Sequence, residues 1–214
     1  MKNIIKLSLG VSIILVTTQG LGADTLIKAF EEGKVSGEIK SLYFQKEVSD
    51  KKVSVWTNGG NLSYKTGNFY GFNAGVTVQA STVTASDLDN APTAYNQDQN
   101  VSGAVLSQAY LQYSRDNTTA KVGRQYISSP LLEGSGSRMF KESFEGVVLT
   151  NTDISNTTIL AAYVDKEQYR TNIASGGTDV KDVSDFEQIQ NGAYTLYVNN
   201  KSIENLTVDA QYLQ

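Results

Sequence analysis

Residues 69–80 of the chain, with the sequence FYGFNAGVTVQA, decide its fold. Apolar side chains fill one alternate set of positions, namely Tyr70, Phe72, Ala74, Val76, Val78 and Ala80. The set between them is more polar and consists of Phe69, Gly71, Asn73, Gly75, Thr77 and Gln79. Because successive side chains of a β-strand point to opposite faces, this period of two predicts a strand with one apolar face. Alternation over about 9–11 residues is enough for a tilted strand to cross a bilayer, and this stretch is long enough.

The same alternation recurs along the chain and predicts about nine strands. We place them near residues 35–44, 59–66, 69–80, 105–115, 118–124, 144–151, 157–165, 192–200 and 205–214. The predicted connections are alternately short (67–68, 116–117, 152–156 and 201–204) and long (45–58, 81–104, 125–143 and 166–191). Short turns at one end and long loops at the other are typical of bacterial outer-membrane barrels. A soluble β-sandwich is the alternative, but its strands are usually shorter, at about 5–6 residues.

The predicted strands do not complete a barrel. Single-chain bacterial barrels have even strand numbers, and an open sheet would leave unpaired backbone groups in lipid. The last strand also runs to Gln214 within its alternating pattern. We therefore expect an all-β fold in which residues 24–214 form the N-terminal half of an antiparallel transmembrane β-barrel.

The N-terminus has the composition of an export signal. Lys2 and Lys6 precede an apolar run from Leu7 to Val16, and small residues follow at Gly20, Gly22 and Ala23. This order is typical of a secretory signal peptide, which we assign to residues 1–23. An N-terminal anchor helix is the alternative, although the apolar run is short for a membrane span.

The residues after the predicted cleavage site have a helical pattern. Leu26, Ile27 and Phe30 would share one face of a short amphipathic helix within Asp24–Gly33. A solvated tail is the alternative for so short a segment.

Composition excludes several kinds of chemistry. The chain has no cysteine and no histidine, so it has neither disulfides nor the commonest general base and transition-metal ligand. Without Lys2 and Lys6, 18 − 2 = 16 basic residues face 22 acidic ones, which gives a net charge of −6. An acidic exported chain is not expected to bind nucleic acid. The acidic segment 87–90 lacks a calcium-loop pattern, so we expect neither metal nor cofactor.

Catalysis is also a weak hypothesis. A Ser–Lys pair drawn from Ser135, Ser137 and Lys141 is conceivable, but such residues are common in loops. We expect a protein that is not an enzyme.

Several short motifs, in this order, resemble the OprD family of outer-membrane porins. They are ADTL at 23–26, GKVSGE at 33–38, TGNFYGF at 66–72, AYLQY at 109–113, KVGRQ at 121–125, SPLL at 129–132, SRM at 137–139 and SFEG at 143–146. The resemblance covers residues 23 to about 165. It implies an 18-stranded barrel around a narrow pore, of which this chain supplies the first half.

The resemblance also implies a function. Family members lie in the outer membrane, contact its lipid and lipopolysaccharide, and let small polar solutes diffuse through passively. Many of these solutes carry carboxylates, as amino acids and short peptides do. A surface-exposed structural or adhesin-type barrel is the alternative. The sequence does not distinguish a monomer from a homotrimer.

Four cationic residues are the candidates for the pore constriction. The third long loop, residues 125–143, carries Arg138, which matches the family's loop arginine, and Lys141. Arg124 and Lys121 lie on the strand before it. A guanidinium can hold a carboxylate by two parallel hydrogen bonds. The sequence leaves alternatives open, namely a structural ion pair for Arg124 and a charge at the membrane interface for Lys121.

Two further features concern the loop and the strand ends. The family often has Asp at the position of Ser137 and Pro at the position of Lys141. Aromatic girdle positions are predicted at Tyr43, Tyr64, Tyr70, Tyr113, Tyr163 and Tyr212.

Overall fold

The computed structural model describes residues 6–14, 23–48, 51–86, 99–171 and 182–214. Its elements are β1 (Lys6–Ile14), α1 (Leu26–Glu31), β2 (Lys34–Val48), β3 (Lys51–Lys65), β4 (Phe72–Ser86), β5 (Gly103–Arg115), β6 (Thr118–Gln125), β7 (Ser128–Ser129), β8 (Leu132–Glu133), β9 (Ser143–Asn151), β10 (Thr157–Gln168), β11 (Phe186–Ile203) and β12 (Leu206–Leu213). No helix among the described residues is long and apolar enough to cross a membrane.

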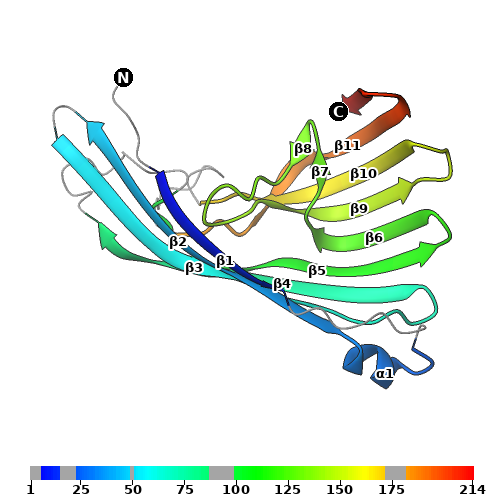
Figure 1. The fold of residues 1–214 in the computed structure, drawn as a ribbon, viewed down its shortest axis with the longest axis horizontal. Helices are drawn as coiled ribbons and strands as arrows, with labels where there is room; N and C mark the ends of the chain where they lie inside the picture. Colours follow the sequence, from blue (N-terminus) through cyan, green and yellow to red (C-terminus); the bar gives the residue numbers. More distant parts are fainter. Residues whose placement is uncertain (1–5, 15–22, 49–50, 87–98, 172–181) are drawn as a thin grey trace.

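One antiparallel sheet contains nearly all of the strands. It has 10 strands in the order β1-β2-β3-β4-β5-β6-β9-β10-β11-β12, while β7 and β8 form a separate hairpin. Strands adjacent in the sheet are therefore also adjacent in the chain, apart from the inserted hairpin (Figure 1). The predicted fold class is confirmed as an all-β antiparallel sheet.

The first strand belongs to the segment that we assign to the signal peptide. β1 pairs with β2 from Lys6 opposite Phe44 to Ile14 opposite Ser36. Without β1 the sheet has 10 − 1 = 9 strands, the number expected from the alternation. Cleavage of residues 1–23 stays a prediction, and it would expose the edge of β2.

Tight turns close one end of the sheet, as predicted near 116–117, 152–156 and 201–204. The turn predicted at 67–68 is longer than expected, because β3 ends at Lys65 and β4 begins only at Phe72. Asp116, Asn156 and Asn205 have φ angles of 51°, 55° and 60°. Asn and Asp tolerate this left-handed conformation better than other non-glycine residues, because their side chains hydrogen-bond locally. The last turn lies at Glu204–Asn205, since β11 continues to Ile203, so the predicted 201–204 turn is shorter than expected.

The prediction of a long loop at 45–58 is wrong. β2 and β3 extend through most of this range and leave only residues 49–50 between them. Val53 and Val55 are buried in a cluster with Leu42 and Phe44 on the neighbouring strand and with Phe140 from the third loop. Packing against a distant segment therefore keeps these residues in strand conformation.

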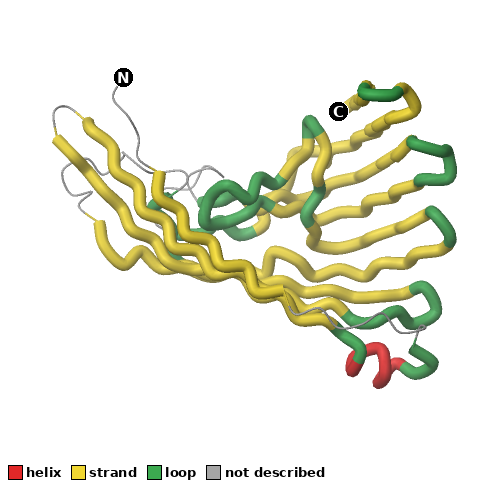
Figure 2. Tube along the Cα trace, in the orientation of Figure 1, coloured by secondary structure: helices red, strands yellow, loops and turns green. Residues whose placement is uncertain are grey.

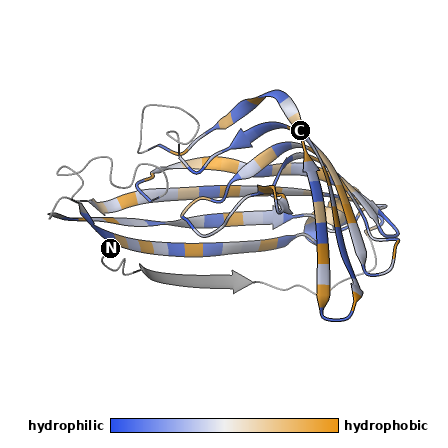
Figure 3. Cartoon of the chain, turned by 90° about the horizontal axis from the view of Figure 1, so that it is seen from above, coloured by the Kyte–Doolittle hydropathy of each residue, from blue (hydrophilic) through white to orange (hydrophobic). Residues whose placement is uncertain are grey.

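The sheet is curved, and its two faces differ (Figures 1 and 2). Along β4 the side chains of Asn73, Thr77 and Gln79 are buried, whereas Val76 and Val78 are exposed. This polar face is the concave one. Gln79 bonds to the third loop, and the third loop lies inside the curve of the sheet (Figure 1). Figure 3 shows the alternation of polar and apolar residues along the strands.

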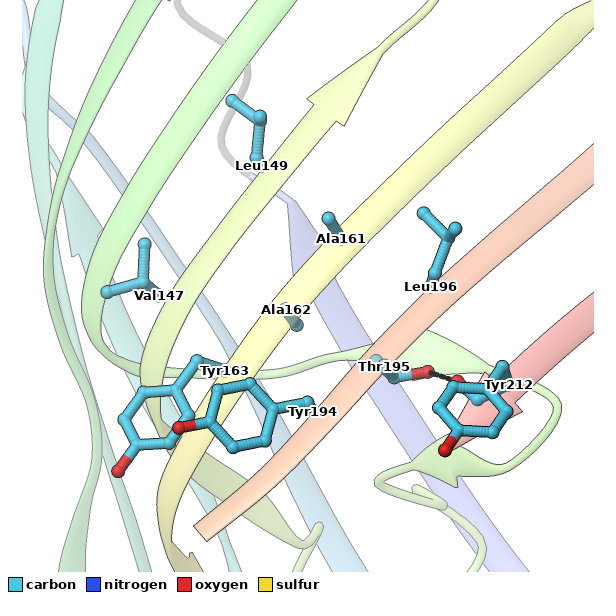
Figure 4. A pocket seen from close by; sticks show the side chains of 9 residues that line it. All are labelled: Val147, Leu149, Ala161, Ala162, Tyr163, Tyr194, Thr195, Leu196 and Tyr212. Atoms are coloured by element: carbon cyan, nitrogen blue, oxygen red, sulfur yellow. Dashed lines mark hydrogen bonds between the residues drawn. The ribbon is translucent and has the colours of Figure 1, made fainter. Parts of the chain in front are cut away.

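The convex face is apolar. Figure 4 shows the residues around a shallow depression over β9 to β12. Ala162 and Thr195 belong to the rows of the concave face, and the other lining residues belong to the convex rows, namely Val147, Leu149, Ala161, Tyr163, Tyr194, Leu196 and Tyr212. The rings of Tyr163 and Tyr194 lie side by side, with centroids 4.8 Å apart. Exposed apolar side chains with tyrosines among them are what a membrane-facing barrel wall requires.

Candidate pore constriction

The third loop, residues 126–142 between β6 and β9, crosses the concave face (Figures 1 and 2). Met139 and Phe140 are buried in an apolar cluster contributed mainly by β2, β3 and β5. Ile127 and Leu132 are buried in a second cluster contributed by β9 and β10. These two clusters fix the loop to both sides of the curved sheet.

Two polar side chains of the sheet hold the backbone of the loop. Lys40 of β2 donates from Nζ to the carbonyls of Gly136 and Arg138, at 3.3 and 3.0 Å. Gln79 of β4 makes paired bonds with Lys141: its Oε1 accepts from the backbone N–H, and its Nε2 donates to the backbone carbonyl, both at 2.8 Å. The loop is therefore held in one position beside β2 and β4.

The β7–β8 hairpin extends the loop to the far edge of the sheet. Gln211 of β12 accepts from the N–H of Leu131 at 2.8 Å and donates to Oγ of Ser129 at 2.9 Å. The same amide nitrogen also donates to Thr195 of β11. The third loop thus spans the concave face from β2 to β12.

A cavity of about 290 Å³, lined by both polar and apolar side chains, lies between the loop and the sheet. It is lined by Gln112, Thr119, Lys121, Gln125, Tyr126, Ile127, Ser128, Val148, Thr150 and Leu160. The Lys121 ammonium lies 4.5 Å from the ring centre of Tyr110 on β5. Lys121 therefore occupies the concave face, as its alternation with Gln125 predicts.

Tyr110 needs space on this face, and a glycine provides it. A Cβ atom at Gly75 would come within 2.4 Å of the Tyr110 ring. The absence of a side chain at Gly75 therefore relieves crowding next to Lys121. The space is occupied by the Tyr110 ring of β5 and not by the third loop.

Lys141 lies over the ring of Tyr126, a residue that also lines this cavity. Its ammonium is 4.4 Å from the ring centre of that tyrosine. Burial raises the pKa of Tyr126 to about 12, although a hydrogen bond with Ser107 lowers it, so the phenol is neutral near pH 7. Lys141 thus contacts an uncharged aromatic side chain that lines the same cavity as Lys121.

Arg138 occupies the part of the loop that Lys40 holds. The residue is partly buried, and its carbonyl accepts the 3.0 Å bond from Lys40. Nearby, the hydroxyls of Ser135 and Ser137 bond to each other at 3.0 Å. The structure therefore brings Arg138, Lys141 and Lys121 to the concave side.

Arg124 lies on the opposite face. It alternates with the concave residues Lys121 and Gln125, and its Nε donates to Glu145 of β9 at 2.8 Å. Lys166 of β10 donates to the same carboxylate at 2.9 Å. The alternative of a structural ion pair therefore fits Arg124, and we do not retain it as a pore residue.

Sequence reasoning missed Lys40, which is 9% exposed and also lies 3.5 Å from Glu38. A signal was present, because charges within a predicted membrane strand are costly and usually face a pore or a partner. Gln79 was predicted on the polar face, but its role in holding the loop depends on a contact 62 residues away.

No cluster of three or more metal-ligating side chains occurs among the described residues. The acidic segment 87–90 lies outside that part of the chain.

A curved antiparallel meander with tight turns at one end, an apolar convex face and an inward-folded loop defines a membrane β-barrel wall. Residues 28–210 match the family model described as outer membrane porin, OprD family. The chain therefore belongs to the OprD family of outer-membrane porins.

Solved porin structures share the fold. OccAB2 of Acinetobacter baumannii is 19% identical, with a TM-score of 0.68 over 87% of this chain and 50% of that chain. OccD3 (OpdP) of Pseudomonas aeruginosa is 18% identical, with a TM-score of 0.65 over 87% of this chain and 41% of that chain. A BenF-like porin from Pseudomonas fluorescens Pf-5 is 13% identical, with a TM-score of 0.66 over 86% of this chain and 50% of that chain.

The chain thus spans half or less of the length of these porins. No curated protein matches it.

Proposed function

We propose that the full-length protein passes small polar solutes by passive diffusion and favours those that carry a carboxylate, such as amino acids and short peptides. The observation that carries this proposal is the fixed third loop, which spans the concave face from Lys40 to Gln211. A loop held at several points narrows a pore permanently, whereas a loose loop would not.

The cations near the loop support the choice of solute. Arg138 and Lys141 belong to the loop, and Lys121 lines the cavity beneath it. In a narrow and partly dehydrated passage, a fixed cation could attract a carboxylate by a few kcal/mol, on the order expected at an effective dielectric of about 20. Such a passage needs charge and a polar wall but no catalytic group.

The rest of the molecular assignment belongs to the same proposal. Residues 1–23 are the signal peptide, and residues 24–214 are the N-terminal half of a barrel with about 18 strands in total. The apolar convex face contacts outer-membrane lipid and lipopolysaccharide. A monomer and a homotrimer are both compatible with these features.

Planar-bilayer recordings of the full-length protein test this function. We expect stable conductance, with a reversal potential in a salt gradient that moves towards cation preference in Arg138→Ala and in Lys121→Gln. Carboxylate uptake into proteoliposomes should slow in the same two variants. The matched control is Arg115→Gln, which removes an equal charge from the exposed last residue of β5, whose side chain is 78% accessible.

Several outcomes would contradict the proposal. A folded protein that does not conduct would favour a structural or adhesin-type barrel. If conductance persists but both variants keep the selectivity and the uptake of the control, the loop cations do not guide the solute.

A further inference from the structure

Helix α1 lies at the short-turn end of the sheet (Figure 1). It is attached there through the side of the helix that carries the small residue Ala29. Ala29 is 1% exposed, and its carbonyl accepts from the N–H of Gly67 at 2.7 Å. The Tyr64 hydroxyl donates to the carbonyl of Phe30 at 2.5 Å, and the Ala23 N–H donates to Asn68. The orientation of the helix is therefore fixed by bonds to β3 and to the turn that follows it.

This orientation turns the apolar face of the helix away from the protein. Leu26, Ile27 and Phe30 are 58%, 73% and 54% exposed. Their positions, i, i+1 and i+4, place them on one stripe of the helix. An amphipathic helix on a soluble domain would bury this stripe, so its exposure requires a partner.

The exposed stripe continues an apolar surface of the sheet. Tyr64, which bonds to the helix, lies in the same outward row of β3 as Leu62, and it faces Val35 of β2 across the ladder. The adjoining turn exposes Tyr70 and Phe72, and Phe72 packs on Tyr113 with centroids 4.7 Å apart. These aromatic residues occupy the end of the strands where a barrel meets the membrane interface.

The basic residue of the helix lies on its other side. Lys28 follows Leu26 by two residues, about 200° around the helix, and its ammonium is 3.7 Å from the Asp24 carboxylate. An amphipathic helix of this kind can lie in the interface plane, with its apolar side towards the acyl chains and its charges towards water.

We propose that α1 is an interfacial anchor that inserts Leu26, Ile27 and Phe30 into the periplasmic leaflet of the outer membrane. The leaflet follows from the turns, because short turns of bacterial barrels face the periplasm. The partner is the headgroup and acyl boundary of a phospholipid bilayer. The inference requires the barrel to sit in a membrane but does not depend on conduction.

Site-directed spin labelling of the full-length protein tests this anchor. The 214 residues contain no cysteine, so Ile27→Cys and Lys28→Cys each introduce one unique thiol among them for a nitroxide. The protein is reconstituted in vesicles of phosphatidylethanolamine and phosphatidylglycerol. Collisions with oxygen, which concentrates in lipid, are compared with collisions with a water-soluble nickel chelate.

We expect the label at position 27 to collide several-fold more with oxygen than with the chelate, and the label at position 28 to show the reverse. Equal access to the chelate at both positions would place the helix in water and overturn the proposal. Loss of access to both reagents at 27 would show a protein partner instead, and dipolar broadening would identify that partner as a second copy.

Discussion

At the scale of single residues, Gln79 shows how a side chain on a membrane strand can set the geometry of a pore. The oxygen and the nitrogen of its side-chain amide both bond to the backbone of Lys141 in the third loop. The nitrogen also donates to the hydroxyl of Ser107 at 2.6 Å. The side chain is almost fully buried. An apolar replacement of similar size would leave the backbone N–H and carbonyl of Lys141 without these partners.

Gln79→Leu is therefore expected to loosen the loop. Each lost buried partner costs about 1–3 kcal/mol, so the loop should detach more often than the barrel unfolds. We predict noisier and larger single-channel conductance with weaker ion selectivity. Thr77→Val is the matched control, because Thr77 is equally buried but bonds to Ser63 and Gln108 on strands. Equal behaviour of the two variants would mean that Gln79 does not position the loop.

The role of Arg124 does not follow from its charge and its position in the sequence alone. Its charge and its place at a strand end made it a pore candidate, yet alternation with Lys121 puts it on the other face. Glu145 and Lys166, which complete its ion-pair group, come from two further strands. Only the assembled sheet shows that these charges compensate one another.

At the scale of elements, the place of β1 in the sheet depends on whether the segment that contains it is removed during export. β1 pairs with the edge of β2, and a strand edge is a ready template for any extended segment. The composition of residues 1–23 is that of an export signal, which is removed during secretion. The mature protein would then leave the edge of β2 open to another strand.

Intact-mass measurement of the protein purified from outer membranes tests this prediction. We expect a mature N-terminus at Ala23 or Asp24, so that the mass is lower by residues 1–22 or 1–23. Substituting Asp for Gly20 and Gly22 should block processing, which provides the control for an unprocessed mass. Retention of Met1 in the purified native protein would mean that β1 is a permanent strand.

At the scale of the whole molecule, the sheet has two open edges, at β1 and at β12. A row of unpaired N–H and C=O groups in hydrocarbon costs several kcal/mol for each group. We therefore predict that the 214-residue chain alone does not form a stable monomeric pore. Heat-modifiable migration on a gel together with steady single-channel conductance of this product would disprove the prediction.

The sequence alone determined most of the strands and the tight turn at 116–117, because both follow from local rules. Period-two alternation in 72–80 indicates which face a side chain takes, and Asp116 indicates a left-handed turn. The motifs from TGNFYGF to SFEG also led to the correct family.

The tertiary structure decided which polar groups meet across the sheet. Lys40 and Arg138 are 98 residues apart, and Gln211 and Ser129 are 82 residues apart. No local pattern encodes such pairs, since they depend on sheet curvature and on the path of the third loop. The same reason explains why the extension of β2 and β3 and the outward face of α1 became visible only in the folded chain.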